Sequence, residues 1–240
     1  NYKNSKFNIF SHQDNQDYAL LNDQELIKKF RKKYFLSKLE IIKKNITRRS
    51  LKKNLKNKYL FSKPNLENLS FVYKLSTLLS IRKKIILKAL NTFKGLPHRN
   101  EIFFKKKEII FINDSKATSF EATRHALKNN KNIFWIVGGL PKLGDAFNLK
   151  SISKNIIKSY IIGKNIDYFK KQIGTSTECK LSFNLENALK DIFKDLFLLK
   201  KKKATILLSP ASASYDQFNN FVERGNYFKK LTLKYAKKFK

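Results

Sequence analysis

The chain has 240 residues, of which 42% are hydrophobic, and it contains one cysteine. This apolar content supports packed cores in one large or two modest domains and argues against a disordered chain. A single cysteine, Cys179, excludes an internal disulfide and a cysteine-based metal cluster. No apolar run is long enough to cross a bilayer, and no basic-then-apolar leader is present. We therefore expect a cytoplasmic protein with no membrane insertion.

The net charge is +34, from 52 basic and 18 acidic residues. Such a charge can indicate a nucleic-acid partner or an anionic membrane surface. The basic residues are spread over the whole chain, however, and Lys, Asn, Ile and Phe are abundant throughout, as in proteins from AT-rich genomes. Compositional bias is the favoured explanation, so no nucleic-acid partner is expected, and a basic nucleic-acid-binding protein remains the less favoured alternative.

The first part of the chain reads as mixed α/β. Apolar spacing predicts helices over residues 25–35, 66–76 and 84–93, and short strands over 17–22, 39–43 and 59–62. Gly95 and Pro97 then end the last of these helices. We place a domain boundary here, which gives domains 1–95 and 96–240.

After this boundary, strands alternate with helices. Strands are predicted at residues 109–112, 133–137, 160–162, 179–182 and 205–208, and helices at 119–129, near 152–158, at 165–173, from 185, and from 217 to the end. This rhythm is typical of a Rossmann-like parallel sheet with helices on both faces.

Polar loops follow three of these strands, at residues 113–118, 138–142 and 209–217. Thr118 and Glu121 have the spacing of a capping box, which predicts that a helix starts after the first loop. Loops at the C-terminal ends of parallel strands are the usual ligand sites of open α/β sheets. Their hydroxyls, lysines and backbone N–H groups would suit a small dicarboxylate or a phosphate.

Four motifs in order make the sequence resemble a known family. They are Gly-Leu-Pro-His-Arg at 95–99, Asn-Asp-Ser-Lys-Ala-Thr at 113–118, Gly138-Gly139 with Lys142, and the run SPASASYDQFNNFVERG at 209–225. The set is similar to the Mur ligases, in particular to the branch that adds D-glutamate to UDP-N-acetylmuramoyl-L-alanine. The resemblance implies the C-terminal portion of a P-loop ATPase-type central domain, truncated, followed by a complete Rossmann-like amino-acid-binding domain.

The resemblance also implies roles for individual residues. ATP would be bound by Asn65, Asn68, Arg99 and Asp114, although Pro64 departs from the family's usual histidine. D-glutamate would be bound by Lys116, Thr118, Lys142, Ser214, Tyr215 and Phe221. Lys6, as a carbamate, would help to hold Mg²⁺, and Lys6 and Lys116 would be the catalytic residues.

The implied reaction is ATP-dependent amide formation through an acyl phosphate in peptidoglycan synthesis, catalysed by a monomer. The sequence contains no G-x-x-x-x-G-K-[ST] motif, so the catalytic P-loop and the UDP-binding domain are expected to lie upstream. We therefore expect this polypeptide alone to be inactive. An inactive amino-acid- or nucleotide-binding fragment is the alternative.

Overall fold

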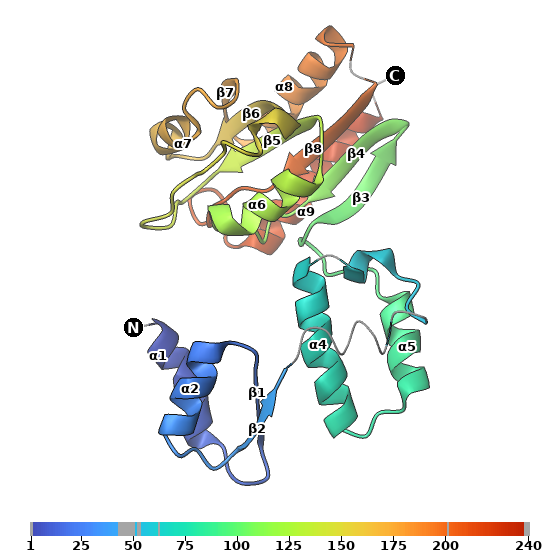
Figure 1. The fold of residues 1–240 in the computed structure, drawn as a ribbon. Helices are drawn as coiled ribbons and strands as arrows, with labels where there is room; N and C mark the ends of the chain where they lie inside the picture. Colours follow the sequence, from blue (N-terminus) through green and yellow to red (C-terminus); the bar gives the residue numbers. More distant parts are fainter. Residues whose placement is uncertain (1, 43–50, 52–53, 62, 201, 238–240) are drawn as a thin grey trace. The chain divides into compact units, whose positions relative to one another are not determined.

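The structure is a computed structural model that describes residues 2–42, 51, 54–61, 63–200 and 202–237. The chain divides into two compact units, Asn1–Lys94 and Gly95–Lys240 (Figure 1). Each unit has hydrophobic clusters of its own. No helix in the described residues is long and apolar enough to span a membrane.

The first unit contains a parallel β-α-β arrangement. Strand β1 (Tyr18–Leu21) pairs in parallel with β2 (Lys38–Ile41), and α2 (Gln24–Lys32) connects them. Asp23 starts α2, because its side chain accepts a hydrogen bond from the N–H of Leu26 at 3.0 Å. The remaining described elements are α1 (Tyr2–Phe7), η1 (Asn8–His12), η2 (Lys58–Phe61), α4 (Lys63–Leu78) and α5 (Lys83–Thr92).

Most predictions for the first unit are confirmed, and two are wrong. The segment 59–62, expected as a strand, falls largely in the 3-10 helix η2, and residue 62 lies outside the described residues. The helix expected over 25–35 ends at Lys32, so Tyr34 lies beyond the end of α2 and is 92% exposed. Its φ of 47° is left-handed, so the helix cannot continue through it.

The second unit is built on a six-stranded sheet with the order β3-β4-β8-β5-β6-β7. Strand β3 is antiparallel to β4, and all other neighbours are parallel. The strands are β3 (Glu101–Lys106), β4 (Glu108–Asn113), β5 (Ile133–Gly138), β6 (Ile156–Ile162), β7 (Cys179–Phe183) and β8 (Lys203–Leu208). All six residues of β5 are buried, as expected of a central parallel strand covered on both faces.

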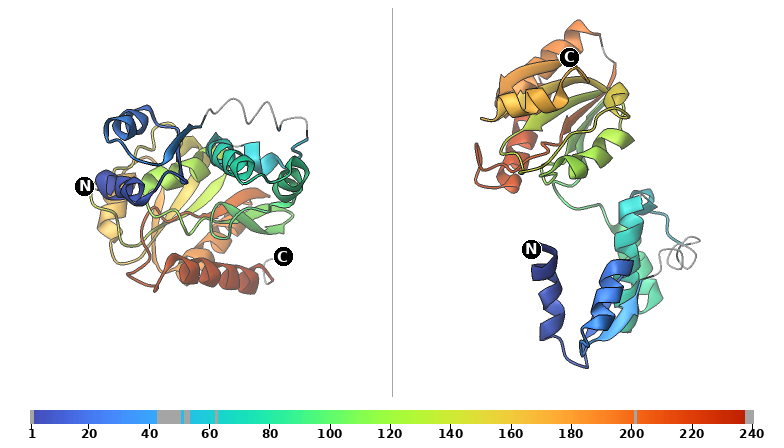
Figure 2. Two further views of the ribbon diagram at one scale, coloured as in Figure 1. Left: turned by 90° about the horizontal axis from the view of Figure 1, so that it is seen from below. Right: turned by 60° about the vertical axis from the view of Figure 1, so that its left-hand side comes forward.

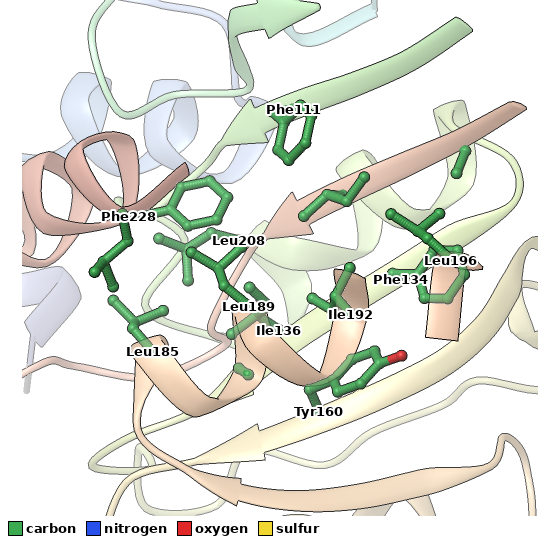
Figure 3. Close-up of a cluster of buried hydrophobic side chains, with 14 of the residues drawn as sticks. Phe111, Phe134, Ile136, Tyr160, Leu185, Leu189, Ile192, Leu196, Leu208 and Phe228 are labelled. Carbon is green, nitrogen blue, oxygen red and sulfur yellow. The ribbon is translucent and has the colours of Figure 1, made fainter. Parts of the chain in front are cut away.

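Helices cover both faces of this sheet (Figures 1 and 2). Helices α8 (Leu185–Leu198) and α9 (Phe221–Ala236) pack against one face, where the side chains of α8 lie over the strands (Figure 3). Helices α6 (Phe120–Asn129) and α7 (Ile166–Ile173) cover the other face around the fully buried Trp135. Burying each large apolar side chain stabilises the fold by roughly 1.5–3 kcal/mol, so these clusters hold the helices against the sheet.

The alternating pattern is confirmed, with three corrections. Strand β3, which no prediction covered, forms an antiparallel hairpin with β4. The helix expected near 152–158 is wrong, because only η3 (Ser153–Asn155) is helical and β6 begins at Ile156. The final helix begins at Phe221, not near 217, and residues 214–220 form a turn-rich loop.

The start of α6 also differs from the expected capping box. Ser119, not Thr118, is the N-cap, and its side chain accepts from the N–H of Ala122 at 3.4 Å. The carboxylate of Asp145 accepts from the N–H of Phe120 at 2.6 Å and satisfies another donor of the first turn. Thr118 is exposed, and it does not cap the helix.

Candidate functional site

Three loops meet at the C-terminal edge of the second unit's sheet. Strands β4, β8 and β5 are neighbours in that order, so the loops that follow Asn113, Leu208 and Gly138 leave the same edge side by side. The N–H of Asp114 donates to the carbonyl of Leu208 at 2.8 Å and continues the β4–β8 ladder into the loop. The three polar loops predicted from the sequence are therefore brought together.

The loops after β5 and β8 are also paired through their backbones. Leu140 and Ala213 exchange both N–H···O hydrogen bonds, each at 3.0 Å. This close approach requires Gly139, which has a φ of 133°. A Cβ atom there would lie 2.5 Å from both the carbonyl oxygen of Ala213 and the hydroxyl oxygen of Ser212. Gly139, one of the two glycines that the sequence pointed to, thus allows the loops after β5 and β8 to join.

A buried arginine connects the loop after β8 to the loop after β4. Arg224, on α9, is 1% exposed. Its Nε donates to Ser115 Oγ at 3.0 Å, and its Nη2 donates to the carbonyls of Ser115 and Ser212 at 2.8 and 2.9 Å. Burial lowers the pKa of its guanidinium to about 10, against the opposing effect of Asp216.

Sequence reasoning did not identify Arg224 as part of the site. Arg224 lies inside the fourth motif, at 209–225, but it was given no role there, and the chain has 51 other Lys and Arg residues. Its partners Ser115 and Ser212 lie 109 and 12 residues away, so only the folded chain reveals the contact.

Asp114 is held by hydrogen bonds from its own chain. It is 8% exposed; its Oδ1 accepts from the N–H of Asn100 at 2.9 Å, and its Oδ2 accepts from the hydroxyl of Ser209 at 2.7 Å. Burial raises the pKa of its carboxyl to about 6, while these two hydrogen bonds and the charge of Arg99 act in the opposite direction. Its expected contact with a nucleotide stays a prediction.

Lys116 and Phe221 lie together although they are far apart in the sequence. The Nζ of Lys116 is 3.8 Å from the centroid of the Phe221 ring. His98 packs edge-to-face against the same ring, with centroids 5.9 Å apart. The backbone N–H of Lys116 donates to the carbonyl of His98 at 3.0 Å. The second and fourth motifs therefore converge at this point.

The other residues assigned to amino-acid binding differ in exposure. Thr118 and Lys142 are exposed on the loops after β4 and β5, and Tyr215 is 71% exposed on the loop after β8. Ser214 is buried at 3%, and its carbonyl accepts from the N–H of Phe218 at 2.8 Å. The structure places all of them on the three converging loops, and their roles stay predictions.

The remaining predicted residues lie in the first unit, apart from Arg99, which is exposed in the second. Lys6 is exposed on α1, Asn65 is half-buried on α4, and Asn68 is exposed on the same helix. Among the described residues, no group of three or more His, Cys, Asp and Glu side chains gathers in a way that could hold a metal ion. The metal and nucleotide roles of these first-unit residues stay predictions.

The edge of the sheet offers a positive, hydroxyl-bearing surface. Helix α9 begins at Phe221 with Asn220 as its N-cap, so the positive end of its dipole points toward the site. N–H groups in a first helical turn lack partners within the helix and can bind an anion. Together with Lys116, Lys142 and Thr118, this arrangement favours a small anionic ligand with several oxygen atoms.

The fold is that of known ligases. MurF from Acinetobacter baumannii matches with a TM-score of 0.55 at 14% identity, over 72% of this chain and 38% of that one. MurF from Thermotoga maritima, solved in complex with ADP, matches with a TM-score of 0.50 at 17% identity, over 72% and 39% of the two chains. These likenesses define an α/β protein of the Mur ligase fold.

Sequence relatives narrow the assignment. Three proteins named UDP-N-acetylmuramoylalanine–D-glutamate ligase match at 38% identity (Wolbachia sp. subsp. Brugia malayi), 34% (Rickettsia felis) and 43% (Bartonella henselae). The matches cover 68%, 75% and 59% of this chain, and 33%, 40% and 30% of those proteins. No model of a protein family matches the sequence. The chain belongs to the Mur ligase family, and it spans between about a third and two fifths of the length of the first relatives it matches.

Proposed function

We propose that this chain is the amino-acid-accepting part of an ATP-dependent ligase that adds D-glutamate to UDP-N-acetylmuramoyl-L-alanine. The observation that carries the proposal is the convergence of the loops after β4, β5 and β8, which brings Lys116, Lys142 and Ser214 to one edge of the sheet. The printed names of the sequence relatives supply the substrate pair.

Two carboxylates of D-glutamate would be bound by different loops. Thr118 and Lys142 would bind one carboxylate by a hydroxyl hydrogen bond and an ammonium charge. Ser214 and the backbone N–H groups at the start of α9, near Phe221, would bind the other, with Tyr215 at the rim of the same loop. Two anchored carboxylates fix the direction of the amine and disfavour amino acids that lack the second carboxylate.

The proposed reaction forms one amide bond for each ATP consumed. The terminal phosphoryl group of ATP is transferred to the alanyl carboxylate, and ADP leaves. The amine of D-glutamate then attacks the acyl phosphate, loses a proton and displaces inorganic phosphate. Asn65, Asn68, Arg99 and Asp114 would hold the nucleotide, and Lys6, as a carbamate, would help to hold Mg²⁺, which when bound neutralises phosphoryl oxygens. Lys116 would contact the bound D-glutamate and stabilise the negative charge that develops in the transition state.

Calorimetric or NMR titration of the chain with D-glutamate tests the amino-acid site. We expect millimolar binding of D-glutamate and weaker binding of D-alanine, which lacks the second carboxylate. Lys142→Met should weaken D-glutamate binding, while Lys128→Met, at an exposed lysine on α6, should leave it unchanged. A folded chain that binds D-alanine as well as D-glutamate, or binds neither, would contradict the proposal.

Catalysis by this polypeptide alone is not expected, because the sequence contains no phosphate-binding G-x-x-x-x-G-K-[ST] loop. An ADP-release assay with ATP, Mg²⁺, UDP-N-acetylmuramoyl-L-alanine and D-glutamate measures this directly. Release above the background without enzyme would show that the chain turns over by itself. Binding of D-glutamate without ADP release would agree with the proposal that this chain supplies the amino-acid site and not the phosphate-binding loop.

A further inference from the structure

The ring of Phe221 lies between a lysine and a histidine that come from different parts of the second unit. The Lys116 ammonium is 3.8 Å from the ring centroid, and the His98 ring meets the same ring at an interplanar angle of 79°. Phe221 is the first residue of α9, while Lys116 lies in the loop after β4. The ring therefore joins the two loops that carry the proposed D-glutamate contacts.

The histidine side of this arrangement is held in one position. His98 Nδ1 lies 2.9 Å from Nδ2 of Asn113, which is a donor, so Nδ1 accepts and the ring is neutral with its proton on Nε2. Gly225 leaves room for the ring, since a Cβ there would lie 2.2 Å from Nδ1. Burial, followed by the charge of Lys229, lowers the pKa of His98, in agreement with a neutral ring. His98 is thus a fixed support for Phe221.

The Lys116 ammonium is placed by the aromatic ring and not by a carboxylate of the described residues. Among the described residues, Lys116 makes no ion pair, and its ammonium lies near the start of α9, where the helix dipole disfavours a cation. The negative face of an aromatic ring attracts an ammonium at this distance. Lys side chains carry a large rotamer entropy, so a lysine already ordered by a ring loses less freedom when it binds an anion.

We propose that Phe221 is a positioning residue. Its ring presents the Lys116 ammonium to a carboxylate of the bound amino acid. This inference rests on the proposed function and deepens it, because the backbone at Phe221 was expected to contact D-glutamate and the ring now has a separate role. His98 supports the ring from the other motif and takes no direct part in binding.

The test compares Phe221→Met, which keeps apolar bulk without a ring, with Phe221→Tyr, which keeps the ring. Lysine ε-methylene groups are labelled with ¹³C, and the Lys116 signal is assigned from its loss in Lys116→Arg. In the wild type this signal should be shifted upfield by the ring, and D-glutamate should move it along the same saturation curve as binding. Phe221→Met should abolish the upfield shift and weaken D-glutamate binding about 2- to 30-fold, the range expected for a cation–π contact.

Phe221→Tyr should retain both the shift and the affinity, and Phe197→Met, at a 74% exposed ring on α8, should change neither. Phe221→Met that binds D-glutamate as tightly as the wild type would overturn the positioning role while leaving the proposed function intact. A wild type that does not bind D-glutamate would overturn both. Should Phe221→Met fail to fold, the wild-type signal decides: no upfield shift, or no response to D-glutamate, overturns the proposal.

Discussion

The guanidinium of Arg224 donates to the backbone carbonyl of Ser115 over 2.8 Å, across 109 positions of sequence. The same Nη2 donates to the carbonyl of Ser212 at 2.9 Å. One buried side chain thus satisfies carbonyls of the loops after β4 and β8, which carry most of the proposed amino-acid contacts. This residue adds to the contacts that Asp114 makes with Leu208 and Ser209 between the same two loops.

Replacing Arg224 with lysine should destabilise the second unit by about 2–4 kcal/mol, because an ammonium cannot make the forked contacts and leaves buried carbonyls unsatisfied. Urea unfolding followed by the fluorescence of Trp135, the single tryptophan, measures this. Arg124→Lys, at an exposed arginine on α6, is the matched control and should change the free energy of unfolding by less than about 0.5 kcal/mol. Equal effects of the two substitutions would contradict the inference that Arg224 holds the two loops together.

The alternating architecture was predictable because parallel strands covered on both faces carry continuous apolar runs, as in β5 and β8. Strand β3 was missed because its hairpin turns at Lys107, which adopts a φ of 53° without the usual glycine or asparagine. The helix predicted near 152–158 failed because a short apolar run fits either periodicity. Pairing of β6 with β5, a contact distant in sequence, decides for the strand.

The candidate site was predictable in its loops but not in its internal contacts. Strand ends and glycines marked the loops at 113–118, 138–142 and 209–217, which the parallel sheet then gathers. The contact of Lys116 with Phe221 depends on a loop and a helix start that meet only in the fold. Arg224 depends on three partner atoms supplied by two other segments. The motifs locate these residues in the sequence, but only the fold shows which of them meet.

Asp114→Asn should change how the stability of the second unit depends on pH. The folded pKa of Asp114 is raised from 3.8 to about 6, so between these values the folded state binds more protons than the unfolded state. The stabilisation from this protonation is complete below pH 3.8 and is lost as pH rises through about 6.

The unfolding free energy of Asp114→Asn minus that of the wild type should therefore increase by about 3 kcal/mol from acid pH to neutral pH. Urea titrations of both proteins at several pH values, read from Trp135 fluorescence, give this difference. The comparison cancels contributions from the other titrating groups, which both proteins share. A difference that stays constant with pH would show that Asp114 has no raised pKa.

Ser209→Ala should raise the pKa of Asp114 further above its wild-type value of about 6. The Ser209 hydroxyl donates to Asp114 Oδ2 at 2.7 Å and favours the ionised carboxylate, so its removal favours the protonated form. The carboxyl ¹³C resonance of labelled Asp114 reports the pKa during a pH titration. Ser212→Ala is the control, because its hydroxyl donates to the carbonyl of Gly138 and should leave the Asp114 pKa unchanged.

Gly139→Ala should be far more damaging than Gly144→Ala, although both glycines have positive φ and lie in the same region of the chain. A Cβ at Gly139 would meet Ala213 and Ser212 oxygens at 2.5 Å, whereas a Cβ at Gly144 would meet nothing within 4 Å. Gly144→Ala should cost about 1 kcal/mol from backbone strain alone. Gly139→Ala must additionally separate the paired loops after β5 and β8. We expect it to lower stability by several kcal/mol on the scale of an overpacked buried site, and to weaken D-glutamate binding in the fraction that remains folded. Urea unfolding and D-glutamate titration of both variants check this, and similar losses for the two alanines would mean that the Leu140–Ala213 pairing does not organise the site.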